Sequence, residues 1–160
     1  MSNVFEPYFD ADQDGPSPFR WRRARIARQA GSQKLGASLY ELPAGASSWP
    51  LHIHHANEEL IVVLAGRPTL RTLDGERALE PGEVIACPAG RSGGHRLDNH
   101  TSEAARVLVV STMIAPELNE YPDSRKLWAR SCAPGGQPGP EDVELLARPG
   151  EGVGYFDGET

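Results

Sequence analysis

The sequence contains no apolar run close to the roughly 18 residues that a membrane-spanning helix needs. Its opening segment, MSNVFEPYFDADQDG, is acidic and lacks the apolar core of a secretory signal peptide. We therefore expect a protein that is not embedded in a membrane and that resides in the cytoplasm.

Positive charge is also scarce. The chain has 16 Lys and Arg against 22 Asp and Glu, which gives a formal net charge of -6 and a pI near 5.3. Nucleic acid and anionic membranes would repel this mean charge. A small molecule is therefore the expected partner, with no nucleic acid and no membrane.

The sequence has only two cysteines, Cys87 and Cys132, and they stand far apart. This usage indicates neither a disulfide framework nor a cysteine-based zinc site, because both need closely patterned cysteines. A single bridge between the two remains compatible with the sequence.

Glycine and proline are abundant, with 17 and 14 of the 160 residues, and they indicate many turns. A chain of this length needs only one hydrophobic core. From residue 35 onward, short apolar stretches alternate with Gly, Pro and Asp-Gly turns, a pattern typical of an all-β sandwich or barrel. Asp74-Gly75 predicts a two-residue hairpin turn, and Pro81-Gly82 a second turn. The expected strands are Ala37 to Leu42, Leu51 to His54, Glu59 to Leu64, Thr69 to Leu73, Glu76 to Leu79, Glu83 to Cys87, His95 to Leu97 and Arg106 to Thr112.

Three parts are expected along the chain: an extended N-terminal arm at 1–34, a β-barrel at 35–115, and an irregular tail at 116–160 that packs on the barrel. Within the arm, FRWRRARIAR holds five arginines between apolar residues. This alternation favours a solvated face of a strand or short helix over a patch for anions or nucleic acid. In the tail, Val143 to Ala147 fits either a short helix or an edge strand.

Four of the five histidines fall in or beside two short segments. In the first segment, His52 and His54 are two residues apart, so on a strand both side chains point to one face. The polar sequence HANE then allows a turn, after which Glu59 can return to the same place. The second segment supplies His95 from a distant part of the chain. We therefore expect a metal site made of His52, His54, Glu59 and His95.

Three imidazoles and one carboxylate suit one divalent transition metal, with Fe, Mn, Zn, Ni and Cu all possible. Four protein ligands leave positions open for water or substrate. Glu58 is an alternative to Glu59 as the carboxylate ligand. His55 should face away from the site because it follows His54 directly, and His100 is expected in solvent.

These two segments resemble the two motifs of the cupin superfamily, the first with His-x-His and Glu and the second with the last His. The resemblance implies a single-domain cupin with a double-stranded β-helix, or jelly-roll, barrel, and the segments STMIAPE, YPDS and GYFDGE are similar to those of small, mostly uncharacterised cupins. Two loops depart from the usual spacing of these motifs. Six residues rather than five stand between Gly45 and His52, and Arg91 to Gly94 lengthen the second motif ahead of His95. The added Gly93-Gly94 pair is expected to let the backbone approach a ligand closely.

The superfamily includes dioxygenases, isomerases, decarboxylases and non-enzymatic binders, so the fold alone does not decide whether this chain is an enzyme. The first hypothesis is a metal-dependent oxygenase or isomerase that acts on a small oxygen-bearing molecule, including a sugar or sugar phosphate. The alternative is a non-catalytic sensing or binding module. Catalytic residues beyond the metal ligands are unknown. The expected pocket-lining residues are Ile61, Val63, Cys87 and Leu97, with Cys87 also compatible with core packing.

Uncovered sheet edges further predict a homodimer.

Overall fold

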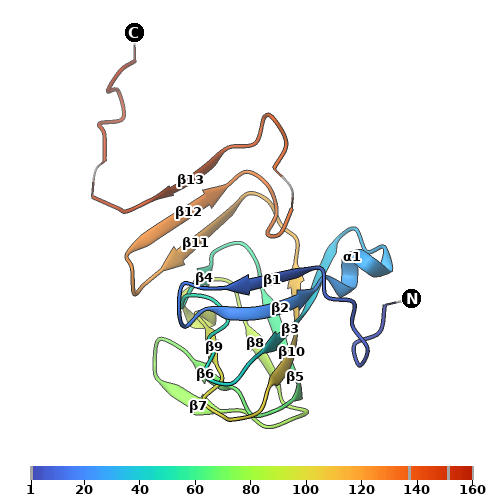
Figure 1. The fold of residues 1–160 in the computed structure, drawn as a ribbon. Coiled ribbons are helices and arrows are strands. Elements are labelled where there is room, and N and C mark those ends of the chain that lie inside the picture. Colours follow the sequence, from blue (N-terminus) through green and yellow to red (C-terminus); the bar gives the residue numbers. More distant parts are fainter. Residues whose placement is uncertain (1, 137, 151, 160) are drawn as a thin grey trace.

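The computed structural model describes residues 2–136, 138–150 and 152–159, and its regular secondary structure consists almost entirely of strands joined by loops (Figure 1). The expected all-β barrel is confirmed. Its strands are β3 (Leu35–Leu42), β4 (Ile53–His54), β5 (Glu59–Ala65), β6 (Thr69–Arg71), β7 (Glu76–Ala78), β8 (Val84–Cys87), β9 (Arg96–Asp98) and β10 (Ala105–Thr112).

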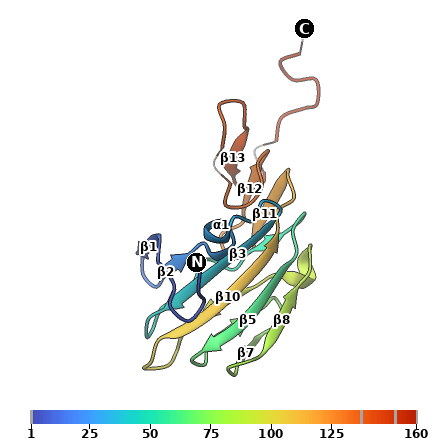
Figure 2. The same ribbon diagram turned by 90° about the vertical axis from the view of Figure 1, so that its right-hand side faces the viewer.

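Two of the sheets enclose the core. The larger has the order β1-β2-β3-β10-β5-β8, and the smaller has the order β7-β6-β9. Along β10, every second residue is buried, as the period of two in a strand requires when one face packs on a core. The core combines residues from both sheets: Leu42, Ile61, Val63, Leu70, Leu79, Cys87, Leu97, Val107 and Val109. Figure 2 shows β3, β10, β5 and β8 side by side in the tilted larger sheet.

The predicted turns lie where strands reverse, although one is longer than expected. Arg71 pairs with Glu76, so β6 and β7 are joined by four residues, 72–75, rather than by Asp74-Gly75 alone. Within this loop, the backbone N–H of Thr72 donates to the Gly75 carbonyl at 2.8 Å. Thr72 and Leu73 thus belong to the loop and not to the strand.

The N-terminal arm is more regular than the extended segment that we expected. It contains β1 (Ala11–Asp14), β2 (Arg20–Ala24) and the short helix α1 (Ile26–Ala30). β1 pairs with β2, and β2 pairs with β3, so this hairpin extends the larger sheet. Backbone hydrogen bonding to the sheet fixes a segment whose sequence has little periodicity of its own.

The C-terminal part likewise forms strands, namely β11 (Glu117–Tyr121), β12 (Lys126–Arg130) and β13 (Glu144–Ala147). With β4 they make a third sheet of order β13-β12-β11-β4, which Figure 1 shows above the barrel and facing the β1–β2 hairpin. Residues 143–147, for which helix and strand were both open, thus supply the edge strand β13. Arg91–Gly93 forms a short 3-10 helix (η1) that was not expected from the sequence.

Among the described residues, no helix is both long and apolar enough to cross a bilayer.

Candidate metal centre

The first two histidines are placed by the short strand β4. His54 ends this strand and His52 precedes it, with the buried Ile53 between them. The two Nε2 atoms are 3.0 Å apart, so both side chains project to one face as the spacing predicted. β4 is held in register by β11, where Asn119 pairs with His54.

The third histidine is brought in by backbone pairing. His52 and His95 form an antiparallel bridge in which the His95 N–H donates to the His52 carbonyl at 3.0 Å and the reverse bond is 3.3 Å. The two ring centroids are 4.7 Å apart. The second segment therefore lies directly beside the first, although 43 residues separate the two in sequence.

The carboxylate is Glu59, the first residue of β5. Its Oε2 lies 3.0 Å from Nε2 of His95 and 3.5 Å from Nε2 of His54. Glu58, the alternative, is exposed, and its backbone N–H donates to the Thr112 hydroxyl. The structure thus places His52, His54 and Glu59 close enough together to hold one metal ion. His95 lies beside this group because its Nε2 contacts Glu59.

Each imidazole is oriented by a contact at its other nitrogen. Nδ1 of His52 lies 3.2 Å from the Pro50 carbonyl, and Nδ1 of His95 lies 2.9 Å from the Gly93 carbonyl. A carbonyl can only accept, so both Nδ1 atoms are protonated donors and both Nε2 atoms are the ones directed to the site.

His54 is oriented by two residues that the sequence did not single out. Its Nδ1 lies 3.3 Å from Oε2 of Glu117 and 2.8 Å from Nδ2 of Asn119, both buried on β11. Glu117 accepts the proton if Nδ1 carries it, whereas the Asn119 amide donates if it does not. Glu117 ends the segment STMIAPE, which is similar to small cupins, but that similarity gave it no role, and the tail in which it stands was expected to be irregular.

Glu117 is a fully buried carboxylate with a complete set of donors. It accepts from the Asn57 amide and from the backbone N–H groups of His55 (3.2 Å), Ala56 (3.2 Å) and Leu118 (3.0 Å). Burial raises the pKa of Glu117, but His54, Asn57 and the backbone donors outweigh burial and lower it below the ordinary value. A charged carboxylate therefore stands behind His54.

The pKa values of the site residues are shifted in different directions. Burial, together with the neighbouring imidazoles, holds the pKa of His52 well below its ordinary value. Burial also acts to lower the pKa of His95, but the Cys87 thiol and Glu59 raise it to about 10. For Glu59, burial raises the pKa, while the adjacent His95 and His54 bring it below the ordinary value.

This donor set fits a divalent transition ion. Oε2 of Glu59 and Nε2 of His95 are buried and lie 3.0 Å apart, yet neither atom has a hydrogen bond of acceptable geometry within the described chain. Buried polar atoms are normally paired, and a cation between them would satisfy both. Imidazole nitrogen with carboxylate oxygen is also the ligand chemistry that Fe, Mn, Ni, Cu and Zn accept.

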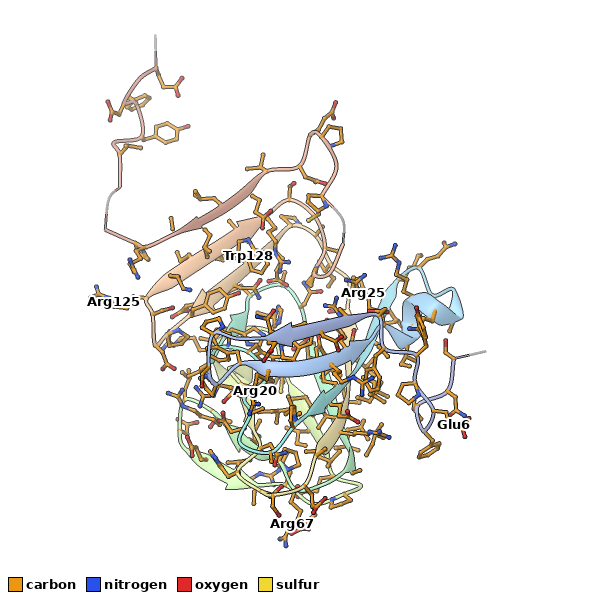
Figure 3. All side chains as sticks on the ribbon, viewed as in Figure 1. Glu6, Arg20, Arg25, Arg67, Arg125 and Trp128 are labelled. Atoms are coloured by element: carbon orange, nitrogen blue, oxygen red, sulfur yellow. The ribbon has the colours of Figure 1, made fainter. Side chains whose placement is uncertain are left out.

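His52 and His54 line a cavity of about 450 Å³, which we call the histidine cavity. All three tryptophans of the chain line it, from β2, from the loop before β4 and from β12. Figure 3 labels Trp128 on β12 and Arg25 after β2, and both line this space. A second cavity of about 460 Å³, the helix cavity, adjoins it and is bounded by α1. Both cavities share Arg23, Arg25, Tyr40, Glu59, Val109, Pro134, Gly135 and Gly136.

The arginine-rich segment is only partly the solvated face that its alternation indicated. Arg20 and Arg22 are exposed. For Arg23 and Arg25 the interpretation was wrong, since both are half-buried and line both cavities. Burial alternates along β2, so Arg20 and Arg22 lie on its exposed face while Arg23 shares with Trp21 the face that borders the histidine cavity.

The other predicted site residues lie elsewhere. Ile61, Val63, Cys87 and Leu97 are all in the hydrophobic core, and neither cavity includes them among its walls. The interior of the barrel is filled by side chains, so the open space is at its mouth, between β2 and β12.

The two remaining histidines stay out of the site. His55 is exposed and its Nε2 lies 3.3 Å from Oε2 of Glu120, and His100 is exposed. The inserted Gly93 approaches the backbone of Pro88 and not an open ligand space, since a Cβ built there would lie 1.8 Å from the Pro88 carbonyl oxygen.

The barrel segment of the chain matches a known protein family. The family model described as "Cupin domain" matches residues 38–111, the segment from β3 to β10. No curated protein sequence matches the chain.

Solved structures are similar over more of the chain. A sugar phosphate isomerase of the cupin superfamily from Silicibacter pomeroyi has a TM-score of 0.76 at 24% identity, over 93% of this chain and 92% of that one. A protein provisionally named a sugar phosphate isomerase, from Acidithiobacillus ferrooxidans, has a TM-score of 0.72 at 21% identity, over 85% and 82%. The polyketide cyclase RemF from Streptomyces resistomycificus has a TM-score of 0.54 at 23% identity, over 64% and 72%. Residues 38–111 therefore form a cupin domain, and the chain has the fold of the cupin superfamily.

Proposed function

We propose that the chain binds one divalent transition metal through His52, His54, Glu59 and His95 and acts as a metal-dependent enzyme on a small hydroxylated molecule. The observation that carries this proposal is the convergence of imidazole Nε2 atoms and the Glu59 carboxylate at the floor of an open cavity. Oε2 of Glu59 and Nε2 of His95 face each other at 3.0 Å, and neither makes a hydrogen bond of acceptable geometry within the described chain, which supports a cation between them.

A metal held at this place would supply Lewis acidity toward a carbonyl or hydroxyl oxygen of the bound molecule. The chain's own residues supply the rest. Pro50, Gly93 and Glu117 fix the imidazole rings through Nδ1, so the ligand atoms need little reorganisation. The aromatic walls offer flat apolar surface to a bound molecule.

Isomerisation of a sugar or sugar phosphate is the reaction that we propose first. Two of the structures that cover most of this chain carry sugar phosphate isomerase names, although at 24% and 21% identity they establish the fold alone. The cavity volume of about 450 Å³ lies in the range that holds a metabolite-sized ligand. Aromatic rings facing this space would pack on the apolar faces of a sugar ring.

Metal content tests the first half of the proposal. Elemental analysis of purified protein should find close to one transition metal per chain, and His52→Ala or His95→Ala should remove most of it, because the remaining ligands are too few. His55→Ala and His100→Ala are matched controls that should keep the metal. Equal metal content in all four variants would contradict the assignment.

Turnover tests the second half. Metal-loaded protein should interconvert aldose and ketose phosphates, followed by nuclear magnetic resonance, and a chelator should abolish the conversion. Metal and ligand binding without any conversion would instead support a non-catalytic binding module.

A further inference from the structure

The walls of the histidine cavity carry positive charge that no role described above explains. Three arginines line it, Arg23 and Arg25 from the N-terminal segment and Arg130 from β12. All three come from outside residues 38–111, the segment that matches the cupin domain. This chain therefore adds cations to the mouth of the barrel from both of its flanking segments.

The acidic partners of these arginines do not neutralise them. Asp10 is the carboxylate nearest to Arg23 and Arg25, and its Oδ1 lies 3.9 Å from Nε of each. Its Oδ2 already accepts from the Arg25 backbone N–H at 3.0 Å and from the Gln29 amide at 3.2 Å. One carboxylate at this distance thus faces two guanidinium groups.

Arg130 has no carboxylate partner among the described residues. Its guanidinium lies over the Trp128 ring at 3.8 Å, and its NH2 group donates to Oδ1 of Asn119 at 2.6 Å. The Asn119 amide in turn contacts Nδ1 of His54. Arg130 is therefore held rigidly beside the metal centre by a ring and an amide, and its charge remains available.

Donor atoms in these walls also lack partners. Nε of Arg23, Nε of Arg130 and Nε1 of Trp49 are buried, and none makes a hydrogen bond within the described chain. Buried donors are normally satisfied, and cationic donors bind oxyanions most strongly. Glu144, which also lines the cavity and stands opposite Arg130 in the β12–β13 pairing, accepts from Trp128 Nε1 at 2.6 Å and forms no ion pair with an arginine of the described chain.

We propose that Arg23, Arg25 and Arg130 form an oxyanion subsite, and that the ligand is a small organic phosphate or carboxylate whose oxygens at the other end reach the metal centre. Glu59 lines both cavities together with Arg23 and Arg25, so the subsite and the metal centre border the same space. The identity of this ligand as a substrate rests on the proposed function, whereas anion binding does not require the metal.

The three tryptophans give a direct measurement. Because all of them line the histidine cavity, the intrinsic fluorescence of the full-length protein reports on its occupancy. Titration with glucose 6-phosphate should give binding at least about tenfold tighter than with glucose or inorganic phosphate, since only the first can occupy both ends. Affinity should fall as ionic strength rises. A titration with gluconate then decides whether a carboxylate replaces the phosphate.

Arginine variants locate the subsite. Arg25→Gln and Arg130→Gln should each weaken glucose 6-phosphate binding about tenfold or more, both with and without a chelator, and leave glucose binding unchanged. Arg22→Gln is the matched control, because Arg22 stands on β2 three residues before Arg25 but pairs with Glu41 and lines neither cavity. Circular dichroism of each variant verifies its fold.

The proposal is overturned if glucose and glucose 6-phosphate bind equally, or if Arg22→Gln weakens binding as much as Arg25→Gln. Loss of metal binding with a retained arginine effect would overturn only the proposed enzymatic function.

Discussion

His95 is the residue whose proton competes most directly with a metal. In the metal-free protein its pKa is raised to about 10 from 6.5, because the Cys87 thiol and Glu59 outweigh the effect of burial. A proton that is held more tightly in the folded chain stabilises that fold fully below pH 6.5, and this contribution is lost as the pH rises through 10.

The same proton must leave when a metal binds, because only a neutral imidazole is a ligand. We therefore expect zinc binding at about pH 7.5 to release about one proton per chain, and the apparent affinity to rise with pH. His52 contributes no proton, since its pKa lies well below the ordinary value. Calorimetric titration in buffers of different ionisation enthalpy measures the release, and a value of zero would contradict the pairing of His95 with Glu59.

Glu117 acts on the site through His54. Glu117→Gln keeps the shape of the side chain, and its oxygen can still accept from the backbone N–H groups of His55, Ala56 and Leu118. Its NH2 group then replaces the oxygen that faces Nδ1 of His54 and the Asn57 amide, so the negative charge and the acceptor behind His54 are lost. Metal affinity should fall by about 10- to 100-fold, the usual effect of removing a partner of a ligand histidine.

Glu120→Gln is the control for this change. Glu120 is on the same strand but contacts His55 and Arg91, neither of which belongs to the site. A competition assay with a chromogenic chelator gives both affinities, and equal losses would show that the effect is general to β11.

At the scale of single elements, the turn η1 controls where His95 points. Gly93 is buried, and its carbonyl accepts from Nδ1 of His95 at 2.9 Å. A Cβ at this position would lie 1.8 Å from the Pro88 oxygen and 2.8 Å from the Cys87 carbonyl carbon, so the backbone of the turn would have to move.

We expect Gly93→Ala to lower the free energy of unfolding by about 3 kcal/mol, at the upper end of the cost of overpacking, and to weaken metal binding as His95 shifts. Urea denaturation of the metal-free protein measures the first effect. Gly152→Ala, where a Cβ meets nothing within 4 Å, should leave stability nearly unchanged. A stable Gly93→Ala protein would mean that η1 can relax without disturbing the core.

The flanking segments matter as elements because they build the site's walls. β2 extends the larger sheet by pairing with β3, whereas β12 belongs to the third sheet, in which β11 connects it to β4. The histidine cavity therefore lies between the larger sheet and the sheet that carries His54.

For the whole molecule, β13 is an uncovered edge of the third sheet, and all four of its residues are exposed. Leu145 and Leu146 are 59% and 56% exposed, and apolar edge strands tend to pair with another chain. The homodimer stays a prediction, as does the cytoplasmic location, and β13 is the edge that we expect a second copy to cover.

Light scattering should give a mass near twice 17.3 kDa at micromolar concentration, and Leu146→Lys should shift it toward one chain. Val153→Lys, at an exposed position outside any strand, should leave the mass unchanged. A mass of 17.3 kDa for the natural sequence would exclude the dimer.

What the sequence by itself determined is the barrel and the proximity of His52, His54, Glu59 and His95 within it. Alternating burial in β10 and the two-residue spacing of His52 and His54 are local consequences of strand geometry, and so they could be predicted from neighbouring residues. The paired motifs further indicated that His95 belongs with them, and the antiparallel bridge provides that proximity.

Only the tertiary structure decided what surrounds that cluster. Whether Arg23 faces water or a cavity depends on the sheet that packs opposite β2, and this contact joins residues about a hundred positions apart. Glu117 likewise acquires its role from donors near His55, far away in the chain. Local periodicity reports which face of a strand is buried, whereas the partner across that face is set by long-range packing that no short segment encodes.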